Sequence, residues 1–123
     1  MTSKKAGRLS DYVEHIISAI DQIQKYAQGL DQNTFIASDM AQDAIIRQFE
    51  VIGEAARRII SIDPEFTKKY PALQLEAAYR MRNALAHGYD TVNLRTVWDT
   101  IEQNLPHLKT EATRVLKIEV AGE

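Results

Sequence analysis

Hydrophobic residues recur every three to four positions along most of the chain, which is the spacing of one face of an α-helix. The first stripe consists of Leu9, Tyr12, Val13, Ile16, Ile17, Ile20, Ile23 and Ala27. It predicts a helix that begins near Leu9, with Ser10 and Asp11 as N-terminal signals, and that ends at Gly29. The polar segment "DQNT" at 31–34 then predicts a turn.

A second long helix is predicted to end near Ser61. Its stripe consists of Ala41, Ala44, Ile45, Gln48, Phe49, Ile52, Ala55, Ala56 and Ile59. Asp39 with Gln42 three residues later has the pattern of a capping box, and Ser38 is an alternative N-cap. Gly53 is small enough to let another helix approach closely, which is a reason to tolerate a residue that costs a helix about 1 kcal/mol relative to alanine.

Prolines and glycines delimit the next two helices. Asp63 and Pro64 suit the N-cap and the first position of a short helix. A third long helix is predicted to begin near Pro71 and to end at Gly88. Its stripe consists of Ala77, Ala78, Met81, Ala84 and Leu85.

A last helical segment is predicted from Asn93, a suitable N-cap, with a break or kink at Pro106. Its stripe consists of Leu94, Val97, Trp98, Ile101, Leu105, Leu108, Ala112, Val115 and Leu116. Trp98 belongs to this stripe, so we expect it in the core or in a subunit interface rather than in a base-stacking platform. No strand alternation is visible. The predicted fold class is therefore all-α: an up-down helical bundle of four main helices plus a short helix.

The chain has 123 residues, the length of one domain. We expect that domain to span 1–123, with flexible ends at 1–7 and 118–123. The chain contains no cysteine, which excludes a disulfide framework and a thiolate metal site. No apolar run approaches the roughly 18 residues of a membrane span, and the basic start lacks the apolar block of a signal peptide. A cytoplasmic protein without membrane contact is expected.

Several classes of chemistry find no support in the residue spacing. The histidines at 15, 87 and 107 are not at metal-ligand spacing, and no glycine-rich phosphate loop or serine nucleophile turn is present. We therefore expect neither a metal nor another cofactor. His15 is interpreted as a surface or boundary residue, His107 as a residue at a helix start that takes part in no chemistry, and Glu54 as structural. The net charge is −2, yet residues 57–95 hold seven cations against four carboxylates. This excess fits a modest, salt-sensitive phosphate-binding patch, and it fits an ordinary solvated charged face at least as well.

The third long helix carries a second, polar face near its C-terminus. The stretch "RNALAHGY" places Arg82, Asn83, His87 and Tyr89 there. A histidine with a near-neutral pKa can take a proton from a ribose hydroxyl or give one to a leaving oxygen, and an arginine can stabilise charge on phosphoryl oxygens. Residues five apart lie about 140° apart around a helix. Spacing alone leaves phosphodiester chemistry and a plain helix-capping histidine both open, and favours the cap.

Three segments carry a resemblance to a known family. The pattern Arg82-x4-His87-x-Tyr89, with asparagine after the arginine, resembles the signature of HEPN-domain toxins of the HepT type. "IGEAARR" at 52–58 resembles the second-helix signature of that family, and "TVWDTIEQNLPHL" at 96–108 resembles its final-helix stretch. The resemblance covers nearly the whole chain in the right order. The basic start and the lack of a tryptophan before the motif depart from the pattern.

This resemblance implies a small all-α homodimer that acts as an endoribonuclease in a type VII-like toxin–antitoxin pair. It implies a metal-independent composite site at a dimer cleft, with Arg82 on the phosphate, His87 as general acid or base and Asn83 in support. It also implies a minimal nucleotidyltransferase antitoxin as the partner, which neutralises the toxin by AMPylation of Tyr89. Phosphate added there would occupy the anion site and repel RNA.

Two other functions stay open from the sequence. One is a non-catalytic dimeric HEPN module that binds RNA or a nucleotide. The other is a helical interaction protein whose histidine only caps a helix. The intact Arg82, His87 and Tyr89 favour the ribonuclease, because the loss of any of them would favour a binding module.

Overall fold

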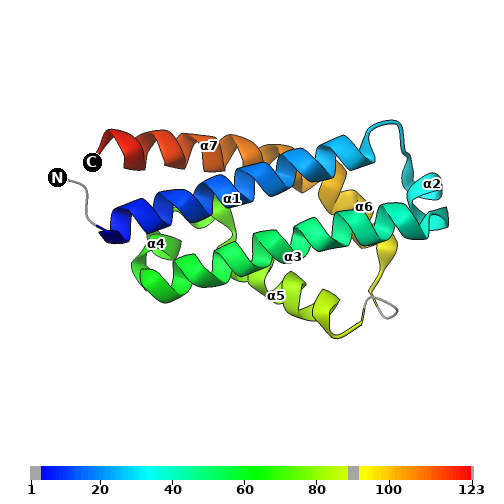
Figure 1. Ribbon diagram of the computed structural model, residues 1–123, viewed down its shortest axis with the longest axis horizontal. Helices are drawn as coiled ribbons and strands as arrows, with labels where there is room; N and C mark the ends of the chain where they lie inside the picture. The colour runs from blue at the N-terminus through cyan, green and yellow to red at the C-terminus, as the bar shows by residue number, and fades with distance from the viewer. Residues whose placement is uncertain (1–3, 89–91, 123) are drawn as a thin grey trace.

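Two long antiparallel helices, α1 (Lys4–Ala27) and α3 (Asp39–Ile62), run through the length of the molecule (Figure 1). The structure is a computed structural model that describes residues 4–88 and 92–122. Helix α7 (Leu105–Ala121) lies along α1, so the start of α1 and the end of α7 meet at one end of the molecule (Figure 1). The described part of the chain contains helices and turns but no strand. The predicted all-α helical bundle is thus confirmed.

Both terminal helices extend beyond the ends predicted from the hydrophobic stripes. Helix α1 begins at Lys4 rather than near Leu9, and α7 continues to Ala121. The additional first turn of α1 lies beside the end of α3, where Lys5 Nζ is 3.6 Å from a carboxylate oxygen of Asp63. Polar residues continue a helix without adding to its apolar stripe, so periodicity alone marks these ends too early.

The segment predicted as a polar turn at 31–34 instead begins a short helix, α2 (Gln32–Ala37). Asp31 and Thr34 form a capping box, in which each side chain accepts a hydrogen bond of 2.8 Å from the backbone N–H of the other. Phe35 on the same helix is fully buried. The prediction was wrong because aspartate and threonine favour both turns and helix N-termini, and only the buried aromatic residue distinguishes the two.

The capping box predicted at Asp39 and Gln42 does not form. Ser38, the alternative cap, accepts a hydrogen bond from the backbone N–H of Ala41, and Asp39 is the first helical residue. Gln42 is buried, and its amide donates to the backbone carbonyls of Phe35 and Ile36 at 3.0 and 2.8 Å. Gln42 therefore satisfies the last carbonyls of α2 rather than the first N–H groups of α3.

The connection from α3 to the third long helix has more structure than predicted. Asp63 caps α4 (Pro64–Lys69) as expected, with its carboxylate accepting from the backbone N–H of Glu65. The next helix does not begin at the following proline, because Pro71–Leu73 (η1) is one turn of 3₁₀ helix and Gln74 has left-handed backbone angles. Helix α5 begins only after this break and spans Leu75–Ala86.

The C-terminal segment is divided into three consecutive pieces. Asn93 caps α6 (Leu94–Asp99) as predicted, with its side chain accepting from two backbone N–H groups of the first turn. The chain then widens into a π-helix, Thr100–Asn104 (η3), and narrows again into α7. Pro106 occupies the first turn of α7, directly after the π-helix, and it cannot donate a backbone hydrogen bond to that helix. The kink predicted at Pro106 thus takes the form of a π-helical segment before the proline.

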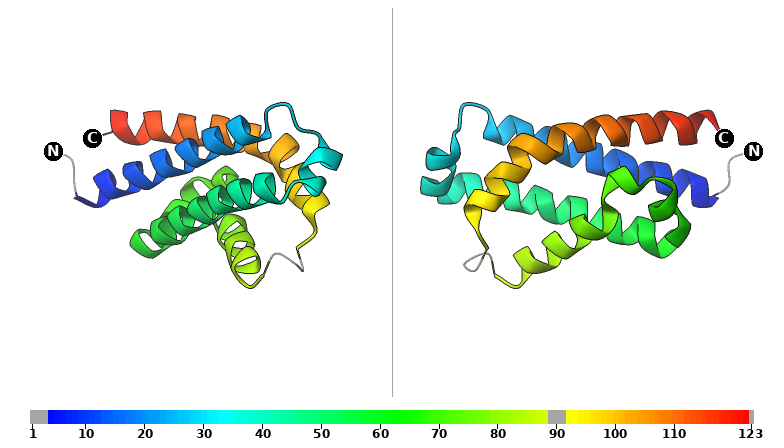
Figure 2. Two further views of the ribbon diagram at one scale, coloured as in Figure 1. Left: turned by 45° about the vertical axis from the view of Figure 1, so that its right-hand side comes forward. Right: turned by 180° about the vertical axis from the view of Figure 1, so that it is seen from behind.

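The buried side chains form one cluster between α1, α3, α7 and the shorter helices. Trp98 is 5% exposed and its ring lies 5.4 Å from that of Phe35, so the prediction that it belongs to the core is confirmed. Helix α5 packs on α3 and diverges from the α6–η3–α7 segment (Figure 2). This divergence leaves one side of α5 accessible. None of the described helices is both long and apolar enough to cross a membrane.

Candidate active site

Arg82 lies where α5 crosses α3 at its closest. A Cβ built on Gly53 of α3 would be 2.1 Å from the Cβ of Arg82 and 2.9 Å from the carbonyl oxygen of Ala78. No side chain fits in that space. The predicted close approach at Gly53 is therefore confirmed, and it sets the base of the Arg82 side chain directly against the backbone of α3.

Among the described residues, the guanidinium of Arg82 contacts two partners, one on α5 and one on α3. It donates to the amide oxygen of Asn83 at 3.0 Å, and it lies 3.7 Å from a carboxylate oxygen of Glu54 on α3. The Arg82 side chain is 36% exposed. The structure thus brings together Arg82 and Asn83, two of the predicted site residues, and leaves guanidinium N–H groups accessible for an anionic ligand.

Glu54 organises a larger cluster of arginines. Its two carboxylate oxygens accept hydrogen bonds from Arg57 at 2.8 and 3.2 Å, and one of them also accepts from Arg58 at 3.1 Å. The hydrogen bond from Arg57 is the main cause that lowers the pKa of Glu54 to about 2, with Arg58 adding to it. One carboxylate therefore holds three guanidiniums, those of Arg57, Arg58 and Arg82, at one surface. We call these four residues the Glu54 cluster.

Sequence reasoning treated Glu54 as structural and left it out of the site. The contacts to Arg57 and Arg58 have a sequence signal, because residues three and four apart face each other on a helix. The contact to Arg82 has none, since it joins two helices whose packing depends on Gly53.

A hollow of about 330 Å³ opens beside Arg82. The hollow extends from α5 over α3 to α1, and most of the side chains that line it are polar. Its lining residues are Tyr12, His15, Arg47, Glu50, Val51, Glu54, Ala55 and Arg82. We call it the Arg82 hollow. His15, predicted to be a surface or boundary residue, is exposed and belongs to this lining.

His87 lies at the C-terminal end of α5, on a different side of the helix. Its backbone N–H donates to the carbonyl oxygen of Asn83 at 3.2 Å, and its side chain is exposed. Gly88, with a φ of 118°, ends the helix as predicted. Within one chain, Arg82 and His87 line different hollows. Tyr89, the predicted modification site, lies outside the described residues.

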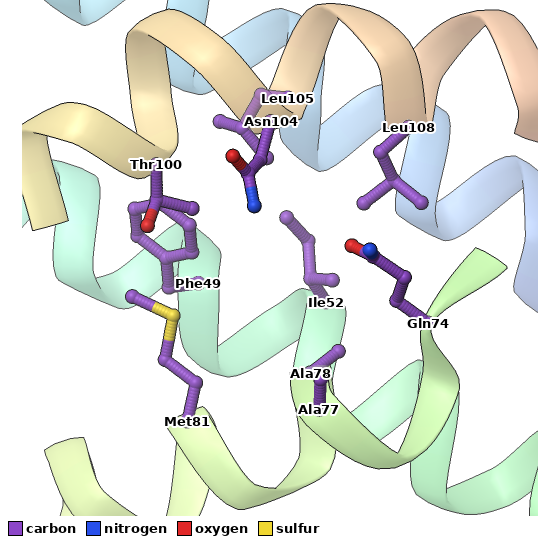
Figure 3. Close-up of a pocket in the computed structure, with 10 residues that line it drawn as sticks. All are labelled: Phe49, Ile52, Gln74, Ala77, Ala78, Met81, Thr100, Asn104, Leu105 and Leu108. Carbon is purple, nitrogen blue, oxygen red and sulfur yellow. The ribbon is translucent and has the colours of Figure 1, made fainter. Parts of the chain in front are cut away.

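The hollow that His87 lines runs between α5 and α6 and is mainly apolar. Its lining residues are Met81, Ala84, His87, Val92, Asn93, Thr96, Val97 and Thr100. A second hollow, of about 190 Å³, adjoins it and shares Met81 and Thr100 (Figure 3). Phe49, Ile52, Leu105 and Leu108 contribute its apolar surface, and the amides of Gln74 and Asn104 point into it (Figure 3). We call the two together the α5–α6 groove.

Comparison with known proteins places the chain in a family. The family model described as "Ribonuclease HepT-like" matches residues 16–115, a range that includes Glu54, Arg82 and His87. No solved structure matches the chain significantly.

Relatives of the chain extend over most of its length. A protein of Thermococcus cleftensis named "Probable ribonuclease HepT" is 32% identical over 107 residues, which are 87% of this chain and 94% of that protein. A candidate RNase of Methanocaldococcus jannaschii is 32% identical over 86% of this chain and 89% of its own length. A longer protein of the same organism, named as a gamma-glutamylcyclotransferase and candidate RNase, is 31% identical over 86% of this chain. The aligned part of this chain spans only 46% of that longer protein.

Proposed function

This chain belongs to the HepT-like ribonuclease family, and we propose that it is a toxin endoribonuclease that cleaves RNA with Arg82 and His87. The observation that carries the proposal is the family match over residues 16–115, which contains both side chains in an Arg-x4-His spacing. The geometry supports the assigned roles, because the Arg82 guanidinium is held in place by Asn83 and Glu54 and remains accessible. We place this activity in the cytoplasm, where cellular RNA is found.

The reaction we propose needs only protein groups and the RNA itself. One imidazole takes the proton of a ribose 2′-hydroxyl while that oxygen forms a bond to the adjacent phosphorus, and the bond from phosphorus to the 5′-oxygen breaks. A second imidazole gives a proton to the departing 5′-oxygen. Arg82 stabilises the additional negative charge on the non-bridging oxygens. No step of this sequence requires a metal ion.

We propose that the second imidazole is the His87 of a second copy of the chain, and that this copy covers the α5–α6 groove. The accessible side of α5 is lined there by the small residues Ala77 and Ala84, which let another helix approach closely. A twofold axis near this groove would bring both His87 side chains to one cleft, and such a self-complementary contact is the usual form of a homodimer.

We further propose that a minimal nucleotidyltransferase antitoxin switches this activity off by AMPylation of Tyr89. The phenolic oxygen would attack the α-phosphorus of ATP, and pyrophosphate would leave. The added phosphodiester would carry a negative charge two residues from His87 along the chain, where the RNA phosphates must bind. Loss of RNA binding would follow from charge repulsion and from occupation of the cleft.

End-labelled RNA incubated with the unmodified protein in EDTA tests the proposal. The wild type is expected to cleave it, and His87→Ala is expected to lose nearly all of that cleavage. Equal cleavage by both proteins would point to a contaminating nuclease and would remove His87 from the mechanism. Absence of cleavage by a wild-type protein whose intact mass shows no adduct would instead favour the non-catalytic dimeric module that binds RNA or a nucleotide.

A further inference from the structure

The Arg82 hollow contains an aromatic ring and a second arginine that the cleavage mechanism does not use. The His15 ring is exposed on α1 and meets the Tyr12 ring edge to face, with centroids 5.5 Å apart and planes at 89°. This perpendicular contact holds the imidazole in a defined orientation. Arg47 of α3 contributes a guanidinium to the same hollow, and its side chain is 72% exposed.

We propose that the Arg82 hollow binds the RNA strand next to the scissile phosphate, with one unpaired base stacked on His15 and a neighbouring phosphate on Arg47. The inference rests on the proposed ribonuclease function, because it takes Arg82 to mark the scissile phosphate. It assigns single-stranded RNA as the substrate class. A base can stack on a protein ring only when it is free of its own helix, and imidazole is among the rings that serve as such platforms.

The charges in the hollow favour a nucleotide strand over a simple anion. The lining holds both charges: the guanidiniums of Arg47 and Arg82, and the carboxylates of Glu50 and Glu54, the second of which already accepts from Arg57 and Arg58. The carboxylates weaken the attraction of the hollow for a simple anion such as phosphate. A nucleotide suits it better, because its phosphate can bind a guanidinium while the amino group of its base donates to a carboxylate.

The Arg47 side chain is free to exchange partners. Its contact with Glu50 is 3.9 Å long and lies at the surface, and exposed pairs of this kind contribute little to stability. An RNA phosphate can therefore replace Glu50 at small cost. Arg82, by contrast, has two partners that keep it in place.

The position of the hollow is compatible with the proposed dimer. The hollow is lined by α1, α3 and α5. The α5–α6 groove is lined by other residues of α3 and α5 together with α6, η3 and α7, and the two linings have no residue in common. A second copy seated in the groove would leave the hollow open. The bound strand would then extend from Arg82 across α3 toward α1, away from the subunit contact.

Binding can be measured separately from cleavage in a His87→Ala background. The probe is a fluorescein-labelled single-stranded RNA of about ten nucleotides, and fluorescence anisotropy gives the Kd. His15→Gln is expected to raise the Kd about tenfold, the loss typical of one stacked base. Arg47→Gln is expected to weaken binding and to reduce the slope of log Kd against log salt by about 0.7, the change for one phosphate contact on a single strand. A duplex of the same sequence should bind less tightly and should be insensitive to His15→Gln.

Two matched variants serve as controls. His107→Gln removes another exposed histidine, and Arg114→Gln removes another exposed arginine that pairs with a carboxylate three residues away on its own helix. Neither residue lines the Arg82 hollow. Both controls are expected to bind the single-stranded probe with the Kd of the parent protein.

Abasic probes separate stacking from a general effect on folding. Removal of one base in the probe should raise the Kd of the parent protein about tenfold at a single position and leave the Kd of His15→Gln unchanged at that position. The proposal is overturned if His15→Gln and Arg47→Gln bind like their controls, or if His15→Gln loses equal affinity for intact and abasic probes. If the variants and probes behave as expected but the wild type cleaves no RNA, the binding site stands and the ribonuclease function fails.

If the wild type cleaves RNA but neither substitution changes binding, the ribonuclease function stands and the binding site fails.

Discussion

Gly53 and Arg82 lie in direct contact where α3 and α5 cross, and the distance between a Cβ on Gly53 and the Cβ of Arg82 would be only 2.1 Å. This contact fixes the height of the Arg82 side chain above α3. The guanidinium at its far end then reaches Glu54, the residue that follows Gly53. The glycine that makes the packing possible and the carboxylate that holds the arginine are thus neighbours in the sequence.

Gly53→Ala is expected to destabilise the protein. The added methyl group would force α5 away from α3, and overpacking of this kind costs about 1–3 kcal/mol. Gly7→Ala is the matched control, because Gly7 also lies within a helix but a Cβ there would meet nothing within 4 Å. That variant should gain up to about 1 kcal/mol from helix propensity. Urea denaturation gives both changes, and equal stabilisation by the two substitutions would contradict the close contact.

Glu54→Gln is expected to lower the free energy of unfolding by about 1 kcal/mol near neutral pH, as for an exposed ion-pair network. The pKa of Glu54 in the folded protein is lowered from its ordinary 4.5 to about 2, chiefly by Arg57. A lowered pKa stabilises the fold fully above pH 4.5, and this stabilisation is lost as the pH falls through about 2. The difference between wild type and Glu54→Gln should therefore decrease as the pH falls below 4.5 and should be mostly lost near pH 2.

Denaturation series from pH 2 to 7 measure this difference, with Glu14→Gln as the control at an exposed glutamate of α1. The control should change stability little near neutral pH. A difference between wild type and Glu54→Gln that persists undiminished at the lowest pH would mean that the carboxylate acts by packing rather than by charge.

Most of the helices could be predicted from the sequence, because apolar stripes and cap residues are local signals. The stripes located α1, α3, α5 and α7, and Asp63, Asn93 and Gly88 marked helix ends correctly. The errors occurred where one residue type serves two structures. Asp31 and Thr34 cap a helix that their composition suggested was a turn, and the break before α5 has no signal of its own.

The candidate site could be predicted only in part, because it depends on contacts between helices that are far apart in the sequence. Arg82 and Asn83 are adjacent in the motif, so their association follows from the sequence. The Arg82 hollow joins side chains from α1, α3 and α5, and its shape depends on helix packing that periodicity does not specify. The same holds for the position of His87 at the α5–α6 groove, because the π-helix of η3 forms part of that groove.

Gln42→Leu is expected to destabilise the protein by about 1–3 kcal/mol. The substitution leaves the carbonyls of Phe35 and Ile36 without the amide that now donates to them at a buried position. Gln22→Leu, at an exposed position of α1, is the control and should change stability little. Thermal and urea unfolding measure both. A Gln42→Leu protein as stable as the wild type would show that water satisfies these carbonyls equally well.

Arg82→Lys is expected to lower the kcat of RNA cleavage by about a hundredfold while the fold is retained. Lysine can pack its stem against Gly53 and keep the charge, but it lacks the planar, multidentate donor set that stabilises phosphoryl oxygens. Arg80→Lys makes the same change at an exposed position of α5 and should keep wild-type activity. Cleavage rates at saturating RNA, together with unfolding curves, separate the two effects. Equal kcat values for both variants would limit Arg82 to a general electrostatic role.

Ala84→Arg is expected to convert the proposed dimer into a monomer and to abolish cleavage with it. Ala84 is exposed on α5 and lines the α5–α6 groove near His87, so a long charged side chain there would be buried without a partner in the dimer. A buried, unpaired charge at an interface costs several kcal/mol, enough to raise the dimer dissociation constant about a hundredfold or more. Ala37→Arg, at an exposed position of α2 outside the groove, is the control.

Analytical ultracentrifugation at micromolar concentration gives the oligomeric state, and the same samples give the cleavage rate. An Ala84→Arg dimer would place the interface elsewhere, and a fully active monomer would show that one chain supplies a complete site.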